Sequence, residues 1–315
     1  MPLALRRVAL HGCKTISRAK PPCLASVFHR GLKRHLNAPA QVSTMLSRRR
    51  SGGAAAGEEP EAEVEHAQEY SLRTPTGIAG LDRIIDGGLI RSKTYLVAGE
   101  TGTGKTIFSL RFILKGLEMG EPCVYVPFDE TIEGTVEGAL TLGWDLETPM
   151  RRNMLRILDA RPFFAEVMRE KFMAEVVREI VKELKKHVTE IGAKRLVIDP
   201  VAPLVGEVVD VSWTRDFIRG FVTAVEKFLG CTTIITSEVP TGSGLLSRFG
   251  VEEFLSSGII KLSITPVENR NLRTMMVRKL RWTRVDLTPY VYEIKPLEGI
   301  VILEPLHEYV KKLKE

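Results

Sequence analysis

The chain has 315 residues, of which 44% are hydrophobic and 27% charged, and its formal net charge is +6. Residues 1–50 hold 11 Lys or Arg and no Asp or Glu, so the remainder carries 34 basic against 39 acidic residues, net −5. The basic character therefore belongs to the N-terminal segment and gives no support for nucleic-acid binding by the rest. Four cysteines without paired spacing argue against a disulfide framework or a zinc site, and no apolar run approaches the length of a membrane span.

Residues 1–70 are expected to form a disordered basic extension. The segment is rich in arginine and acid-free over its first 50 residues, and it continues into a Gly/Ala stretch. This bias is typical of an organellar transit peptide, and it also fits a mis-assigned start with a true beginning such as Met45, or a basic interaction arm. Residues 71–305 are expected to form one large α/β domain, followed by a helical tail over 306–315.

A short apolar strand from Tyr95 runs directly into a phosphate-binding loop. The template G-x-x-x-x-G-K-[ST] is filled by Gly99, Glu100, Thr101, Gly102, Thr103, Gly104, Lys105 and Thr106. Glycines let backbone N–H groups approach an anion, Lys105 brings a charge to the β- and γ-phosphates, and Thr106 offers its hydroxyl to Mg²⁺. A helical run over 107–119 aims its positive end at the same anion. The sequence therefore predicts a site for a nucleoside triphosphate with Mg²⁺.

Beyond the loop, short apolar runs alternate with helical patterns. The runs fit buried parallel strands over 94–98, 123–126, 155–158, 196–198 and 232–236. Helices are expected over 132–142, about 165–188 and about 213–228, the long one with a core stripe of Met168, Phe172, Val176, Ile180 and Leu184. After residue 252, strands are expected over 259–264, 273–277, 291–294 and 299–303, and a helix over 307–315. This order predicts an α/β fold with a mostly parallel sheet flanked by helices and a β-rich C-terminal extension.

Carboxylates follow two of these strands, at the edge of the sheet where ligands bind in such folds. Asp199 ends one strand and is expected to hold Mg²⁺ or its water shell. Asp129 and Glu130 follow another, where a carboxylate can orient and deprotonate the attacking water. The alternative for this pair is a solvated cap of the following helix.

Polar and cationic side chains complete the set. Ser237 and Glu238 end the strand that begins at Thr232, where they can sense the γ-phosphate. Lys279 and Arg281 stand two residues apart, a spacing that on a strand projects both to one face. Such cations can act as a finger at a neighbouring subunit's nucleotide, or they can form a solvated edge.

These motifs, in this order, resemble the RecA-like ATPases of the KaiC type, in particular the single-domain proteins common in archaea. The likeness covers about 73–303 and rests on Pro75–Asp82, Asp86–Leu89, Gly99–Thr106, Phe128–Glu130, Ile198–Asp199, Thr236–Glu238, Arg248–Phe254 and Lys279–Arg281. It implies a RecA-like P-loop NTPase fold over 71–305. It also implies a homo-oligomeric, hexameric ring with ATP at each subunit interface, where Lys279 and Arg281 complete the neighbour's site.

The sequence departs from the family pattern at several positions. The family's catalytic pair is usually Glu-Glu, so Asp129 is one methylene shorter and Glu130 is the expected water activator. Trp282 replaces the Gly that usually follows the Lys-x-Arg. The chain has one such domain where the circadian clock relative has two. Glu253 and Phe254 stand where that relative's phosphorylated Ser-Thr pair falls, so neither autophosphorylation there nor a circadian role is expected.

The sequence thus predicts a cytoplasmic, Mg²⁺-dependent, slow ATPase whose hydrolysis switches the shape of a homo-oligomeric ring toward an unidentified protein partner. A second hypothesis is an ATP-sensing module with negligible turnover. A third is a DNA-dependent ATPase related to recombination-associated RecA paralogues, which the net charge of −5 outside the N-terminal segment disfavours.

Overall fold

The computed structural model describes residues 72–159, 161–167, 172–204, 211–241, 245, 247–248, 250 and 256–314. The predicted extension over 1–70 and the Glu253–Phe254 pair lie outside these residues. No helix among the described residues is both long enough and apolar enough to cross a membrane.

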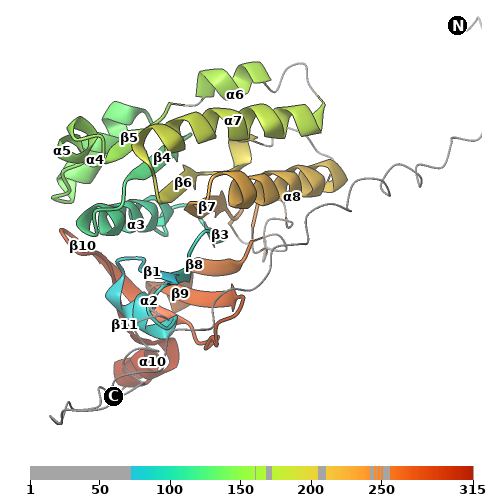
Figure 1. Cartoon of the computed structure of the whole chain (residues 1–315). Helices are drawn as coiled ribbons and strands as arrows, with labels where there is room; N and C mark the ends of the chain where they lie inside the picture. The colour runs from blue at the N-terminus through green and yellow to red at the C-terminus, as the bar shows by residue number, and fades with distance from the viewer. Residues whose placement is uncertain are drawn as a thin grey trace, which may run out of the picture. The chain divides into compact units, whose positions relative to one another are not determined.

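A nine-stranded mixed sheet forms the centre of the described fold (Figure 1). Its parallel strands, in order from one edge, are β5 (Leu155–Ile157), β4 (Cys123–Pro127), β6 (Arg195–Asp199), β7 (Thr232–Glu238), β3 (Thr94–Gly99) and β8 (Gly258–Val267). From β8 the sheet continues antiparallel through β9 (Arg270–Leu280), β10 (Tyr290–Lys295) and β11 (Gly299–Pro305). The predicted fold class, a mostly parallel sheet with a β-rich C-terminal extension, is confirmed.

Helices cover both faces of the parallel strands. Figure 1 shows one group on one side of the sheet: α6 (Arg161–Val167), α7 (Met173–Ile191) and α8 (Val211–Phe228). The buried cluster on the opposite side includes residues of α2 (Ala79–Ile84), α3 (Lys105–Glu118) and α4 (Ile132–Thr141). The remaining short elements are β1 (Arg73–Thr74), which pairs with β2 (Leu89–Ile90), then α5 (Glu147–Arg151), the 3₁₀ turn η1 (Ala202–Leu204) and α10 (Leu306–Lys314), which lies beside β11.

The hydrophobic core divides into two clusters, one on each face of the sheet. In β3, Leu96 and Ala98 belong to the cluster that includes α7 and α8, whereas Tyr95 and Val97 belong to the cluster that includes α3. Successive side chains of a strand point to opposite faces, so a strand covered on both sides is apolar at every position. This is why the buried strands read as continuous apolar runs. Cys123 lies in one of these strands and is buried, as predicted.

The predicted single helix over about 165–188 is wrong. The structure has α6 and α7 instead, and α7 begins after Phe172, whose φ of −61° and ψ of 145° are extended. The Phe172 side chain is 84% exposed, while Val176, Ile180 and Leu184 are buried as predicted. An extended residue interrupts the helical period, so Phe172 does not share the core face of the residues that follow. Met168 lies outside the described residues.

Candidate functional site

The phosphate-binding loop connects β3 to α3, and its glycines are required by both conformation and space. Gly102 and Gly104 have φ of 81° and 88°, in the left-handed region that favours glycine. A Cβ on Gly104 would meet Ile294 Cδ1 at 2.9 Å, and one on Gly99 would meet the Leu262 carbonyl oxygen at 2.6 Å. Gly104 is also the N-cap of α3, so the loop places the positive end of that helix at the site.

Lys105 bends back over this loop. Its Nζ donates to the carbonyl oxygens of Gly99 at 3.0 Å and Glu100 at 3.1 Å. Burial lowers the pKa of Lys105, and the charges of Glu238, Asp199 and Asp129 oppose that shift. The ammonium group thus stands among carboxylates that supply a favourable field for its charged form.

Asp199 is buried at the carboxyl end of β6 and is held by two hydroxyl groups. Tyr125 Oη donates to Asp199 Oδ2 at 2.9 Å, and Thr236 Oγ1 donates to Oδ1. Burial raises the pKa of Tyr125 well above its usual value and the charge of Asp199 adds to this, so the phenol remains a donor. The neighbouring strands β4 and β7 therefore fix the orientation of this carboxylate.

The Asp129–Glu130 pair follows β4 after one residue, Phe128, and both side chains line the same pocket as Asp199. Burial raises the pKa of Asp129, as do the charges of Glu238 and Asp199, while Lys105 and Arg248 act in the opposite direction. The cap of α4 is Thr131, whose side chain accepts from Gly134 N at 3.0 Å. The alternative that this acidic pair caps the helix is therefore wrong.

A pocket of about 390 Å³ brings most of the predicted residues together. Those in its lining are Thr101, Gly102, Gly104, Lys105, Thr106, Asp129, Glu130, Asp199 and Glu238. Gly99, Glu100, Thr103 and Ser237 are not in the lining. Thr103 and Ser237 are buried, and they accept hydrogen bonds from Tyr292 Oη and from Arg248 N, respectively, at the Thr103 carbonyl and the Ser237 hydroxyl. These two residues support the loop and the strand end.

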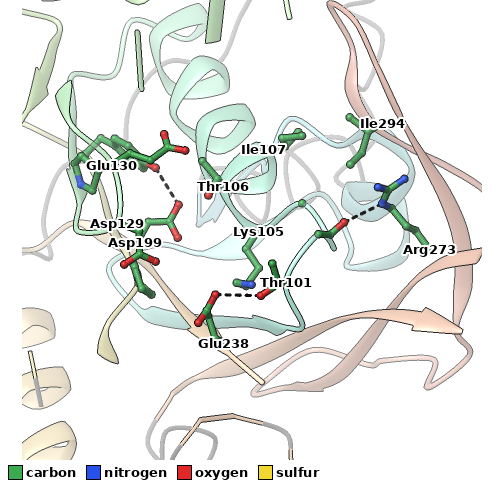
Figure 2. A pocket seen from close by; sticks show the side chains of 15 residues that line it. Thr101, Lys105, Thr106, Ile107, Asp129, Glu130, Asp199, Glu238, Arg273 and Ile294 are labelled. Atoms are coloured by element: carbon green, nitrogen blue, oxygen red, sulfur yellow. Dashed lines mark hydrogen bonds between the residues drawn. The ribbon is translucent and has the colours of Figure 1, made fainter. Parts of the chain in front are cut away.

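Two pocket residues come from the C-terminal strands and were not predicted from the sequence. Arg273 of β9 donates from Nε to the Gly102 carbonyl oxygen at 3.1 Å, and Ile294 of β10 lies against Gly104. Figure 2 shows Asp129, Glu130 and Asp199 on one side of Lys105, with Arg273 and Ile294 on the other. A lone Arg and a lone Ile in strand patterns carry no sequence signal, because only the register of the antiparallel extension brings them to the loop.

Lys279 and Arg281 do not line this pocket. Lys279 Nζ donates to the Ser256 carbonyl oxygen at 2.9 Å. β9 ends at Leu280 and Arg281 directly follows it, so the expectation that both side chains project to one face stays a prediction. Trp282 follows with a left-handed φ of 61°.

The sequence and the fold of this chain can be compared with those of known proteins. A family model described as "ATPase: KaiC" matches residues 74–307. The chain belongs to the KaiC family of ATPases. The UPF0273 protein of Thermotoga maritima is 34% identical over 237 residues, which are 73% of this chain and 95% of that protein. The crystal structure of a KaiC-like protein from Pyrococcus horikoshii OT3 has a TM-score of 0.63 at 34% identity, covering 73% of this chain and 98% of that one.

The KaiC clock proteins themselves are longer. The circadian clock oscillator protein KaiC of Thermostichus vulcanus is 33% identical over 223 residues, which are 70% of this chain but 42% of that protein. The chain therefore spans less than half the length of these KaiC relatives. The predicted resemblance to single-domain KaiC-like ATPases is confirmed, and family membership makes the chain an ATP-binding P-loop NTPase with a RecA-like fold.

Proposed function

We propose that this KaiC-family chain hydrolyses ATP with Mg²⁺ and that the reaction takes place in the pocket at the phosphate-binding loop. The observation that carries the proposal is the convergence of Lys105 and Thr106 with Asp199 and the Asp129–Glu130 pair on one cavity of about 390 Å³. A cavity of this size matches the usual range for small-molecule sites. Its residues supply phosphate binding, metal binding and water activation in one place.

The donors available for Mg²⁺ are the Thr106 hydroxyl and the Asp199 carboxylate, both in the pocket lining. Mg²⁺ bound with nucleotides needs only one or two protein oxygens, since phosphates and waters complete its shell. The described residues hold no group of three or more His, Cys, Asp or Glu arranged for a metal, which agrees with an ion held mainly by its nucleotide. When bound, Mg²⁺ would neutralise charge on the transferring phosphoryl group.

Glu130 is proposed as the residue that orients and deprotonates the attacking water, with Asp129 beside it. Lys105 holds the β- and γ-phosphates together with the loop backbone from Gly99 to Thr106. Glu238, which accepts from Thr101 Oγ1 at 3.5 Å, and its neighbour Ser237 are proposed to respond to the γ-phosphate. Arg273 and Ile294 lie across Lys105 from the carboxylates, where the sugar and base of the nucleotide would meet a cation and an apolar side chain.

Lys279 and Arg281 are proposed to act on the nucleotide bound by a neighbouring copy of the chain. Leu280 pairs with Gly258, which pairs with Tyr95 near the start of β3, so Lys279 and Arg281 lie at the amino edge of the parallel strands. The phosphate-binding loop follows the other end of β3, a strand of 6 residues. At about 3.3 Å per residue the two ends are roughly 17 Å apart, so the finger would serve the next subunit of a homo-oligomeric, hexameric ring. The nucleotide cycle would then switch the shape of that ring, in the cytoplasm, toward a protein partner.

Steady-state phosphate release from ATP tests the proposal. Lys105→Ala should abolish nucleotide binding and turnover, because the loop loses its charge for the phosphates. Glu130→Gln should keep binding but lose turnover by on the order of 10²-fold or more, because a general base is removed. Glu298→Gln, an exposed change between β10 and β11, is the matched control. Unimpaired turnover in Lys105→Ala would contradict the proposal.

The same measurement decides the second candidate, an ATP-sensing module with negligible turnover. In that case wild type and Glu130→Gln would release phosphate at the same low rate while both bind ATP. Single-stranded DNA is added in a further arm, and stimulation of turnover by DNA would favour the DNA-dependent alternative.

A further inference from the structure

Trp282 is the most exposed large apolar side chain in the described part of the chain, with 90% of its surface accessible. It directly follows Arg281 and adopts a left-handed φ of 61°, a conformation that a bulky side chain rarely adopts. The segment is anchored next to it, because Arg73 Nη1 donates to Thr283 Oγ1 at 2.9 Å. The fold therefore holds a large aromatic ring in solvent at a defined position.

Cationic residues flank Trp282 in the sequence. Residues 278–285 include Arg278, Lys279, Arg281 and Arg284 and no acidic residue. A tryptophan flanked by cations fits an apolar hollow with a negative rim, since large aromatic residues at interfaces fill desolvated pockets and complementary charges fix their register.

The structure has a hollow of this kind between α4 and α5, called here the α4–α5 groove. It has a volume of about 360 Å³ and is lined by Ile132, Val136 and Met150 together with Glu133, Glu137, Glu147 and Arg151. Arg151 pairs with Glu147 at 3.0 Å, so the balance of the rim is negative. The groove begins two residues after Glu130, so it adjoins the nucleotide pocket.

We propose that Trp282 of one copy of this chain occupies the α4–α5 groove of the next copy. This inference rests on the proposed function, because the two copies are those that share a nucleotide. Trp282 lies at the amino edge of the parallel strands, whereas Glu130 and the groove follow the carboxyl end of β4. A contact between unlike surfaces of two copies is heterologous, and its repetition gives a ring when the rotation between copies closes and an open filament when it does not. When the indole ring of Trp282 lies in the groove, Lys279 and Arg281 of the copy that supplies Trp282 come beside Glu130 of the neighbouring copy.

The proposal makes Trp282→Gly an informative variant. Glycine adopts a left-handed φ without strain, so the nucleotide-free chain should keep or raise its thermal unfolding midpoint. Self-association in the presence of a slowly hydrolysed ATP analogue with Mg²⁺, measured by light scattering of the full chain, should weaken at least about tenfold. Phe172→Ala is the matched control, because Phe172 is an exposed aromatic residue that lines neither the nucleotide pocket nor the α4–α5 groove, so this change should leave association unchanged.

A charge exchange tests the groove independently of the fold at residue 282. Glu133→Lys with Glu137→Lys makes the groove positive, and Arg284→Glu makes the Trp282 segment less positive. Each chain should self-associate more weakly than wild type. An equimolar mixture should recover part of the association, because the unaltered groove of the Arg284→Glu chain meets the unaltered Trp282 segment of the groove variant.

Association of both Trp282→Gly and the groove variant at wild-type strength would overturn the proposal, as would a mixture that associates no better than its components. If wild type associates and hydrolyses ATP while these variants behave like it, only the groove assignment fails. If wild type itself stays monomeric with the nucleotide analogue, the shared site of the proposed function fails together with this inference, and the groove would be left to a different partner.

Discussion

Asp129 illustrates how the crowding of carboxylates at the pocket affects stability. Burial and the charges of Glu238 and Asp199 raise its pKa above the usual 3.8. Below that value Asp129 is protonated in both folded and unfolded chains. As the pH rises, Asp129 ionises at a lower pH in the unfolded chain than in the folded chain. The contribution of protonated Asp129 to the free energy of unfolding is therefore lost as the pH passes the folded pKa. We therefore expect nucleotide-free Asp129→Asn to be more stable than wild type at pH 7 and equal to it below about pH 3.8.

Thermal unfolding across this pH range measures the effect, and Asp286→Asn provides a control of opposite sign. Hydrogen bonds from Thr288 lower the pKa of Asp286, so its stabilising contribution is present at neutral pH and lost in acid. Asp286→Asn should therefore be no more stable than wild type at pH 7. Because Asp129 is exposed to solvent, its effect should be small and should shrink with added salt. A pH-independent difference for Asp129→Asn would contradict this explanation.

Asp82 shows a different role for a carboxylate, as a brace for the segment before α2. It accepts hydrogen bonds from Thr76 N and Thr76 Oγ1, both at 2.7 Å, and from Gly77 N at 3.1 Å. Asp82→Asn replaces one accepting oxygen with a donor that faces other donors, so we expect a loss of about 1–3 kcal/mol in the free energy of unfolding. Asp86→Asn, at an exposed position, should change it by less than about 0.5 kcal/mol in urea unfolding experiments. Equal losses of unfolding free energy in the two variants would contradict this role of Asp82.

At the scale of elements, the sequence predicts those features that depend on residues close together in the chain. The loop, the buried strands and Asp199 follow from residues adjacent in the chain, so they were predictable. Arg273 and Ile294 reach the pocket through the register of β8, β9 and β10, which a single sequence does not specify. The break before α7 escapes prediction for a related reason, since Phe172 keeps an apolar spacing of four with no Pro or Gly to mark the end of the pattern.

Arg195 links elements at the amino end of β6, and its loss tests how much that link contributes. Its buried side chain donates to Glu121 Oε2 at 2.8 Å, to the Pro75 carbonyl at 2.7 Å and to the Phe112 carbonyl at 2.9 Å. Arg195→Met should cost about 3–5 kcal/mol, because two carbonyls lose their donor and Glu121 keeps only Arg91 as a partner. The exposed neighbour substitution Lys194→Met should cost less than about 0.5 kcal/mol.

Denaturant unfolding of these variants, together with Glu121→Gln and the double variant, separates the ion pair from the carbonyl contacts. If the pair dominates, Glu121→Gln should recover part of the loss in the Arg195→Met background. Purely additive losses would show that the carbonyl contacts, rather than the charge pair, carry the stabilisation.

At the scale of the whole molecule, the decisive geometric fact is that the loop and the Lys279–Arg281 segment lie at opposite edges of the same parallel strands. A chain with an intact loop and a chain with an intact finger should therefore complement each other. Lys105→Ala retains the finger and Arg281→Ala retains the loop, so each alone should be nearly inactive. Random mixing pairs an intact loop with an intact finger at a quarter of the contacts, so the equimolar mixture should recover about a quarter of the wild-type rate.

Phosphate release measured over a dilution series provides the matching control for this complementation. Wild-type activity per chain should fall on dilution, since separated copies lose the finger that completes each site. The mixture should fall with the same concentration dependence, because both depend on the same contact. An inactive mixture of variants that still assemble would show that Arg281 does not act across the interface, and wild-type activity independent of dilution below the association range would place the complete site within one chain.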